Sequence, residues 1–117
     1  MSDVVIYHNP RCSKSRQTLQ LLEEQGITPS IVLYLETPPD AQQLKTLLGQ
    51  LEYTSARQLM RTGETEYKEL GLNQADLPEA TLIDGMVKCP RLIERPIVVA
   101  GGRAKVGRPP ESVLEIL

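Results

Sequence analysis

The feature that most constrains the fold is a pair of short apolar runs on either side of one helical stretch. The first run is Val4-Val5-Ile6-Tyr7 and the second is Ile31-Val32-Leu33-Tyr34-Leu35. Each has the length and composition of a buried strand. Between them, Ser15 to Gln25 is predicted to be helical, and Gly26 is a typical helix stop. The apolar residues at near-helical spacing are Leu19, Leu21 and Leu22. Because a helical crossover between strands usually makes them parallel, the chain is predicted to begin as a βαβ unit.

The middle of the chain, at about 40–90, reads as a helical insertion. Pro38-Pro39-Asp40 ends the second strand, and Asp40 is a suitable N-cap for a helix over Ala41 to Leu51. Glycine and proline residues divide the rest of this region into shorter segments. These segments are predicted as helices at Ser55 to Met60, Glu64 to Leu70 and Glu79 to Val87.

The C-terminal part has a strand pattern followed by a helix pattern. Ile97-Val98-Val99-Ala100 and Ala104-Lys105-Val106 flank Gly101-Gly102, which predicts a hairpin. Pro109-Pro110-Glu111 then starts a last helix, because Pro is tolerated in the first helical turn. Its predicted buried residues are Val113, Leu114 and Leu117. The order βαβ, helices, ββα predicts an α/β chain of thioredoxin-like architecture with a small mixed sheet, as one domain over residues 1–117.

Composition and charge narrow the function classes. The 117 residues include neither Phe nor Trp, so no aromatic platform is available on which nucleic-acid bases could stack. The formal net charge of -2 gives no global attraction to nucleic acid or to anionic lipid. No stretch approaches the length of a membrane span, and no secretory leader is recognised, so we expect a cytoplasmic protein. Two cysteines and one histidine are too few for a typical intrachain zinc site.

Cys12 is the residue with the clearest chemical signal. It lies between the first strand and the first helix, in the run Tyr7-His8-Asn9-Pro10-Arg11-Cys12-Ser13-Lys14-Ser15-Arg16. A thiol at a helix start faces unpaired backbone N–H groups and the positive end of the helix dipole, and cationic side chains are close in the sequence. These surroundings favour the thiolate, which is the nucleophilic form of cysteine. A buried, inert cysteine is the alternative interpretation.

Several separated motifs resemble the glutaredoxin-coupled arsenate reductase family. The resemblance begins with Tyr7-His8-Asn9-Pro10-Arg11-Cys12 and covers nearly the whole chain. The further motifs, in the same order along the chain, are Tyr34-Leu35-Glu36-Thr37-Pro38-Pro39, Leu59-Met60-Arg61, Tyr67-Lys68-Glu69-Leu70-Gly71-Leu72, Arg95-Pro96-Ile97-Val98-Val99 and Gly107-Arg108-Pro109.

The resemblance implies a thioredoxin-like fold and a specific chemistry. Cys12 would be the nucleophile, and Arg61, Arg95 and Arg108 would converge on it to hold a tetrahedral oxyanion. Fixed positive charge is needed because an arsenate anion repels a thiolate, and guanidinium forks suit oxyanion edges. Arsenate would be reduced to arsenite, with glutathione as co-substrate and glutaredoxin as partner. No bound cofactor or metal is implied.

Three further residues have supporting roles in this interpretation. The resemblance suggests that His8 keeps Cys12 ionised, whereas a lone histidine is more often simply packed or hydrogen-bonded. Ser15 replaces the second cysteine of a C-x-x-C pair, so we expect a first-turn hydroxyl and an external source of electrons. Pro96 resembles the cis proline that faces the catalytic thiol in this architecture. Cys89 is expected to be a spectator at a helix terminus.

Two other functions remain open at this point. Redox-responsive transcription regulators that bind RNA polymerase share this fold, but they typically use a C-x-x-C switch that Ser15 removes. A glutathione-dependent monothiol reductase of mixed disulfides would use the same thiolate without arsenate. A phosphatase-like arsenate reductase is disfavoured, because the three residues between Cys12 and Arg16 are too few for the loop of that class.

Overall fold

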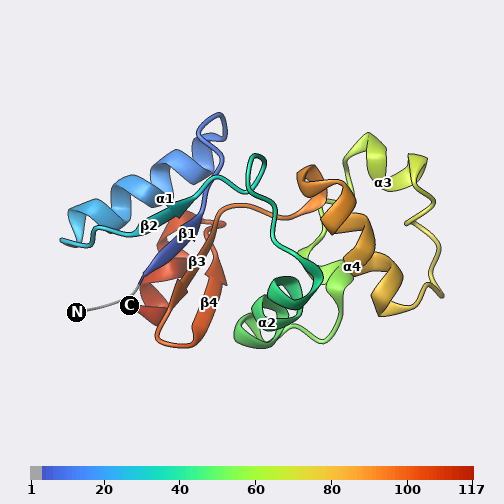
Figure 1. Cartoon of the computed structure of the whole chain (residues 1–117). Helices are drawn as coiled ribbons and strands as arrows, with labels where there is room; N and C mark the ends of the chain where they lie inside the picture. Colours follow the sequence, from blue (N-terminus) through green and yellow to red (C-terminus); the bar gives the residue numbers. More distant parts are fainter. Residues whose placement is uncertain (1–3) are drawn as a thin grey trace. The chain divides into compact units, whose positions relative to one another are not determined.

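The computed structural model describes residues 4–117, which form two compact units (Figure 1). One unit, here called the sheet unit, combines the described residues up to Thr37 with Arg95–Leu117, and the other, the helical unit, is Pro38–Glu94. The elements of the sheet unit are β1 (Val5–Tyr7), α1 (Ser13–Glu24), β2 (Ser30–Val32), β3 (Ile97–Ala100), β4 (Arg103–Val106) and the 3-10 helix η3 (Pro110–Ile116). The elements of the helical unit are α2 (Ala41–Leu51), the 3-10 helix η1 (Ala56–Leu59), α3 (Thr65–Glu69), α4 (Glu79–Lys88) and the 3-10 helix η2 (Pro90–Leu92).

The sheet is small and mixed, in the order β2-β1-β3-β4. β1 pairs parallel with β2, with Ile6 opposite Ile31, and antiparallel with β3, with Ile6 opposite Val98. β3 and β4 form a hairpin whose two turn residues, Gly101 and Gly102, both have positive φ. Glycine adopts that conformation without steric cost, and its twist matches that of the strands. The predicted βαβ and ββ parts of a thioredoxin-like fold are therefore confirmed.

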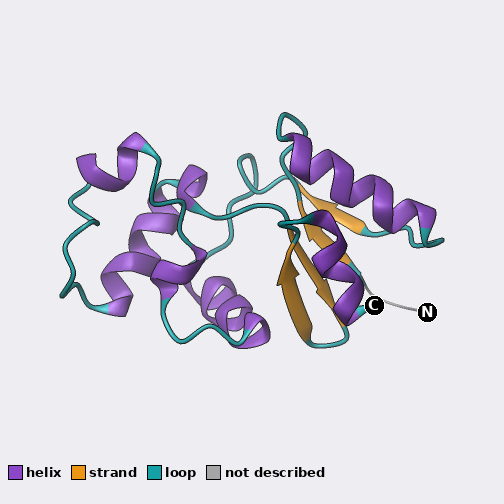
Figure 2. Ribbon diagram, turned by 180° about the vertical axis from the view of Figure 1, so that it is seen from behind, coloured by secondary structure: helices purple, strands orange, loops and turns teal. Residues whose placement is uncertain are grey.

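Two helices cover the core of the sheet unit. α1 and η3 contact each other, and both contribute to the hydrophobic cluster on the sheet (Figure 2). Ile6, Leu22, Val98 and Val113 have no exposed surface. Each side chain of this size contributes about 1.5–3 kcal/mol when fully buried. This packing holds the start of α1 at the end of β1, where Cys12 lies.

The second strand is shorter and less buried than predicted. β2 ends at Val32, and Ser30 and Ile31 are exposed. The following residues form a turn, because the N–H groups of Glu36 and Thr37 both bond the carbonyl of Leu33. The prediction of a buried strand through Leu35 was therefore wrong. β2 lies at an edge of the sheet, and the apolar run after it contains a turn whose residue Tyr34 is buried.

The last helix begins where predicted but has a different geometry. It is a 3-10 helix, with three residues per turn, so side chains three apart share a face. Pro110 and Val113 are buried and Ile116 packs against the core. Leu114 and Leu117, which were predicted to be buried, are 41% and 44% exposed. The prediction assumed α-helical spacing, which would have placed Leu114 and Leu117 on the buried side.

The helical unit follows the predicted sequence of segments. Asp40 caps α2 in a capping box, in which its carboxylate accepts from the N–H of Gln43 and the Gln43 side chain accepts from the N–H of Asp40. The segment predicted at Ser55 to Met60 is the 3-10 helix η1, and the other two segments are α3 and α4. An isolated bridge joins Met60 to Ile93 and closes the unit near its C-terminal end.

Within the helical unit, Arg57 fixes the irregular segment after α3. Its guanidinium donates to the Tyr67 hydroxyl, to the carbonyl of Leu72 at 2.7 Å and to that of Gln74 at 2.7 Å. A side chain with five donors can satisfy several loop carbonyls at once.

None of the helices in the described part of the chain has the length and apolarity needed to cross a bilayer. That the two units act as one domain stays a prediction.

Candidate active site

Cys12 is the N-cap of α1, as the sequence predicted for its place in the fold. Its backbone is extended, with φ -93° and ψ 124°, and its carbonyl accepts the N–H of Arg16 at 3.0 Å. The loop before it is closed by short bonds: the N–H of Cys12 donates to the Asn9 carbonyl at 3.0 Å, and the Arg11 N–H donates to Asn9 Oδ1 at 3.0 Å. The thiol is half-buried at the start of a 12-residue helix.

The pKa of the Cys12 thiol is lowered. Burial alone would raise this pKa, since it disfavours the charged form. The backbone N–H of Ser15, the hydrogen bond and charge of the Arg95 guanidinium, and the N–H of Lys14 together outweigh burial. The two backbone N–H groups belong to the first turn of α1, where they have no partner within the helix and face the Cys12 sulfur. The thiolate is therefore stabilised by fixed groups of the sheet unit.

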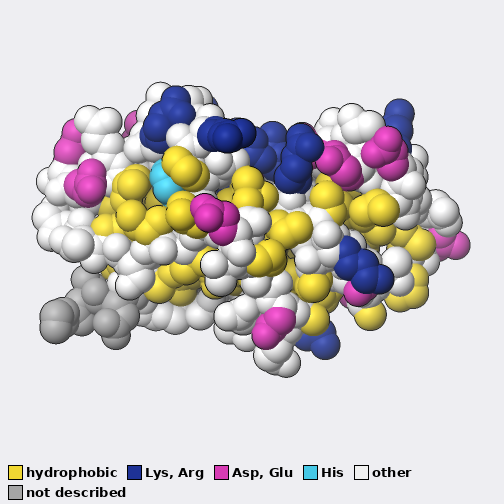
Figure 3. Space-filling view, turned by 45° about the horizontal axis from the view of Figure 1, so that its top comes forward, with side chains coloured by type: hydrophobic (Ala, Val, Ile, Leu, Met, Phe, Trp, Pro, Cys, Tyr) yellow, Lys and Arg dark blue, Asp and Glu magenta, His cyan; other side chains and the backbone are white. Residues whose placement is uncertain are grey.

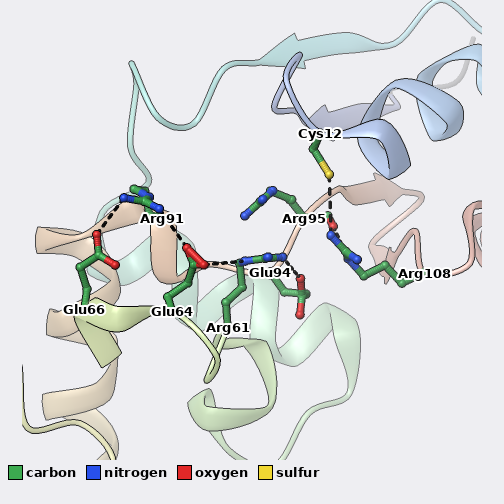
Figure 4. A network of polar contacts seen from close by, with 8 residues as sticks. All are labelled: Cys12, Arg61, Glu64, Glu66, Arg91, Glu94, Arg95 and Arg108. Atoms are coloured by element: carbon green, nitrogen blue, oxygen red, sulfur yellow. Dashed lines mark hydrogen bonds and ion pairs between the residues drawn. The ribbon is translucent and has the colours of Figure 1, made fainter. Parts of the chain in front are cut away.

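Arg108 also lies beside the sulfur. Its Nη2 is 3.7 Å from Cys12 Sγ, and its Nε donates to the carbonyl of Arg95 at 2.8 Å (Figure 4). Of these two arginines, Arg95 is the one that lowers the thiol pKa. The structure thus brings Cys12, Arg95 and Arg108 together, although both arginines lie 83 or more positions after the cysteine in the sequence.

The segments that carry these arginines meet at Gly107. The Gly107 N–H donates to the carbonyl of Pro96 at 2.9 Å, and the peptide bonds before Pro96 and before Pro109 are both cis. A Cβ on Gly107 would lie 2.5 Å from Thr18 Oγ1 and 2.9 Å from Pro96 Cγ. Only glycine therefore allows α1 and these two segments to approach so closely. The cis geometry predicted for Pro96 is confirmed, whereas the roles of Gly107 and Thr18 were missed.

His8 and Ser15 form a buried pair beneath the thiol loop. His8 Nδ1 and Ser15 Oγ are 2.6 Å apart, and Ser15 Oγ also accepts the N–H of Asn9 at 3.0 Å. Burial, and then the charge of Arg16, lower the pKa of His8 from about 6.5, so the imidazole is neutral at pH 7. A neutral ring supplies no positive charge to the thiolate. His8 holds Ser15, which in turn holds the loop at Asn9, and a role of His8 in supporting the Cys12 thiolate stays a prediction.

Arg16 fixes the same loop from the exposed side. Its Nη1 donates to the Pro10 carbonyl at 2.8 Å. From the sequence, Arg16 was only one of the cationic side chains close to Cys12. The sequence shows a basic residue four positions after Cys12. Its hydrogen bond to the Pro10 carbonyl could not be predicted, because it depends on the geometry of the turn before Cys12. In the space-filling view of Figure 3, dark blue Lys or Arg side chains lie near the cyan histidine.

Arg61 lies in the helical unit, in a network of charged side chains. Its Nη1 is 2.8 Å from Glu94 Oε1, and its Nε is 4.0 Å from Glu64 Oε2. Arg91 pairs with Glu64 at 3.1 Å and with Glu66 at 2.9 Å, as Figure 4 shows. Arg61 is therefore held by the carboxylates of Glu94 and Glu64. That it converges on Cys12 with the other two arginines stays a prediction.

Two further features concern possible ligands. Cys89, which was expected at a helix terminus, is the half-buried C-cap of α4 in the helical unit and is not in a disulfide. Among residues 4–117, no group of three or more His, Cys, Asp or Glu side chains could hold a metal ion. The chemistry available from the described side chains of the sheet unit is that of a nucleophilic sulfur beside two guanidinium groups.

The sequence of this chain is similar to a known protein family and to several named proteins. The ArsC family pattern matches residues 7–116. The chain belongs to the ArsC family. A protein of Haemophilus influenzae named arsenate reductase is 51% identical over 97% of this chain and 98% of its own. The Escherichia coli protein YfgD, described as uncharacterized, is 61% identical over 97% of this chain and 96% of its own.

The solved structures of ArsC family relatives have the same fold. A Vibrio cholerae structure titled arsenate reductase superposes with a TM-score of 0.97, at 56% identity, over 98% of each chain. At 23% identity, an ArsC family related protein from Bacteroides fragilis still superposes with a TM-score of 0.84, over 98% of this chain and 99% of the other. The thioredoxin-like fold expected from the sequence is therefore confirmed.

Proposed function

We propose that this ArsC family protein is an arsenate reductase in which the Cys12 thiolate is the nucleophile and glutathione, with glutaredoxin, supplies the electrons. The observation that carries the proposal is the lowered pKa of a half-buried thiol beside Arg95 and Arg108. Relatives from Neisseria meningitidis and Haemophilus influenzae that are named arsenate reductase support arsenate as the substrate.

In the first step, the Cys12 thiolate attacks arsenic. An S–As bond forms, one As–OH bond breaks, and the hydroxide leaves as water after taking a proton from solvent. Arg95 and Arg108 offset the charge of the arsenate oxygens and of the sulfur as they approach. The family resemblance also assigns Arg61 to oxyanion binding, and we retain that assignment as part of the proposal.

In the second step, a glutathione thiolate attacks the Cys12 sulfur. An S–S bond forms and the S–As bond breaks, with its electron pair remaining on arsenic, so As(V) becomes As(III) and arsenite leaves. Each sulfur has lost one electron, which accounts for the two that arsenic gains. A glutaredoxin thiolate then attacks the glutathione sulfur and releases Cys12 as thiolate.

Ser15 supports an external electron donor. It occupies the position of the second cysteine in a C-x-x-C pair, and its Oγ is bonded to His8. The thiol loop therefore contains no second sulfur that could resolve an adduct on Cys12. This feature also argues against a redox regulator that switches by closing a disulfide in this loop.

The test is a coupled assay with two substrates side by side. The full-length protein is incubated with glutathione, glutaredoxin, glutathione reductase and NADPH, with either arsenate or a glutathionylated disulfide as substrate. Arsenite, identified by chromatography, should form only with the protein present. Turnover of the disulfide with no arsenite formed would reject the proposal and favour a monothiol disulfide reductase.

Gly107→Ala should lower kcat/KM for arsenate by about tenfold or more. The added Cβ would clash with Thr18 and Pro96, so the segment that carries Arg108 must shift, and displacements of about 1 Å in a catalytic site can cost about 100-fold. Rates are normalised to the folded fraction, measured by circular dichroism. Gly49→Ala is the matched control, because its Cβ would meet nothing within 4 Å. Equal kinetics for both variants would contradict this role of Gly107.

A further inference from the structure

Glu94 makes the short contact to the Arg61 side chain in the helical unit. Its Oε1 accepts a hydrogen bond from Arg61 Nη1 at 2.8 Å (Figure 4). Both side chains are mostly buried, with 22% of Arg61 and 26% of Glu94 exposed. The mechanism proposed above gives Arg61 a task, the binding of an arsenate oxygen, but it gives Glu94 none.

We propose that Glu94 is a positioning residue, which orients the Arg61 guanidinium for an oxyanion by holding its Nη1 atom. The inference rests on the proposed function, in which Arg61 binds an oxygen of arsenate. In this role Glu94 contacts Arg61 and not the anion. An arginine loses much rotamer freedom when it binds a ligand, and a side chain that is already fixed avoids that loss at the moment of binding.

The backbone brings the two side chains together. The Arg61 N–H donates to the carbonyl of Leu92 at 2.7 Å, and the Glu94 N–H donates to the carbonyl of Leu59 at 2.8 Å. These two bonds flank the isolated β-bridge of the helical unit. Residues that are diagonally opposed across an antiparallel pair lie within reach of long side chains. The contact between Arg61 and Glu94 is therefore part of the fold of this segment.

Part of the guanidinium is left for a ligand. Among the described residues, Nη1 is the only guanidinium nitrogen of Arg61 that has a hydrogen-bond partner. Nε is buried and makes no hydrogen bond, and Glu64 Oε2 lies 4.0 Å from it. An oxyanion can therefore accept from Nη2 without displacing Glu94.

Arg91 holds the second carboxylate of this network. It donates to Glu64 at 3.1 Å and to Glu66 at 2.9 Å. Glu64 is thus already paired, and it contributes negative charge but no hydrogen bond to Arg61. In the described part of the chain, Glu94 is consequently the carboxylate that sets the direction of the Arg61 guanidinium.

Glu94→Ala should lower kcat/KM for arsenate about tenfold, because a misplaced guanidinium binds the oxyanion poorly. The loss should appear mainly in the KM for arsenate, while the KM for glutathione stays within about twofold of wild type, a split that a general structural defect would not produce. Glu94→Gln keeps an oxygen acceptor for Nη1 and should lose less. Unchanged or higher kcat/KM in Glu94→Ala would overturn the proposal, since Glu94 would then be idle or would mask Arg61.

Glu66→Ala is the matched control. Glu66 is 27% exposed and accepts from Arg91 at 2.9 Å, so the variant removes a carboxylate of similar burial and pairing from the same unit. Its kcat/KM for arsenate should stay within about twofold of wild type, because a salt bridge to an exposed arginine contributes little. Equal losses in Glu66→Ala and Glu94→Ala would overturn the proposal, because the effect would then be one of charge alone.

A double-mutant cycle with Arg61→Ala tests whether Glu94 acts through Arg61. In the Arg61→Ala background, Glu94→Ala should change kcat/KM for arsenate by less than about twofold, because residues that act as a unit are not additive. An undiminished loss of about tenfold in that background would show that Glu94 acts through another group, and the proposal would be overturned.

Inorganic phosphate, a tetrahedral oxyanion that the protein cannot reduce, separates this proposal from the proposed function. Its Kd is measured from the protection of Cys12 against iodoacetamide. A Kd raised about tenfold by Glu94→Ala but not by Glu66→Ala would support the positioning role even if no arsenite forms in the coupled assay. Arsenite formation with equal kinetics for wild type, Glu94→Ala and Arg61→Ala would overturn this proposal and leave Cys12 as the nucleophile of an arsenate reductase. Neither arsenite formation nor saturable protection by phosphate would overturn both.

Discussion

Cys12→Ser is expected to reduce glutathione-dependent arsenate reduction by about 10⁴-fold or more, to the background of the assay. Removal of a catalytic nucleophile has effects of this order, because the remaining groups then have no covalent step to assist. The serine hydroxyl would remain protonated at neutral pH, since the groups that lower the thiol pKa are far too weak to ionise an alcohol. The measurement is arsenite formation in the coupled assay.

The control for this result is Cys89→Ser. Cys89 ends α4 in the helical unit, and the mechanism gives it no task. That variant should keep the wild-type rate and consequently show that the loss belongs to Cys12. A Cys12→Ser enzyme with more than a tenth of the wild-type rate would refute the nucleophile assignment.

Arg95→Ala and Arg108→Ala should each lower kcat/KM for arsenate by about 100- to 1,000-fold. Loss of one preorganised donor to a developing oxyanion has this effect in other enzymes. The two variants should differ in the pKa of Cys12: Arg95→Ala should raise it, because Arg95 contributes both a hydrogen bond and a charge, whereas Arg108→Ala should change it less.

Arg103→Ala is the matched control for the two arginine variants. Arg103 belongs to β4 of the same unit, and its Nη2 donates to the carbonyl of Glu115 at 2.7 Å. Its removal should leave kcat/KM for arsenate within about threefold of wild type. Unchanged kinetics in both Arg95→Ala and Arg108→Ala would contradict the proposal that these two arginines bind the arsenate oxygens.

Local pattern was enough to predict most elements of this fold. Apolar runs and glycine or proline boundaries located β1, α1, the hairpin of β3 and β4, and α2 with its Asp40 cap. The errors occurred where one pattern suits two structures. The apolar run after Val32 could be a strand or a buried turn, and the apolar residues near the C-terminus could follow an α-helical or a 3-10 period.

The site was predictable only in part from the sequence. The place of Cys12 at a helix start follows from neighbouring residues. No local rule indicates that Arg95 and Arg108 reach the same sulfur, since that depends on how β3 pairs with β1, on how β4 pairs with β3, and on the close approach at Gly107. The neutrality of His8 likewise depends on burial that a single histidine in a sequence does not indicate.

The most direct test of the account is the pH dependence of Cys12 alkylation by iodoacetamide in the Cys89→Ser background. The thiol pKa is lowered in the folded protein, so the alkylation midpoint should lie below that of the same chain unfolded in urea. Arg95→Ala should move the native midpoint upward. A native midpoint at or above that of the unfolded chain would contradict the claim that Cys12 is a stabilised thiolate.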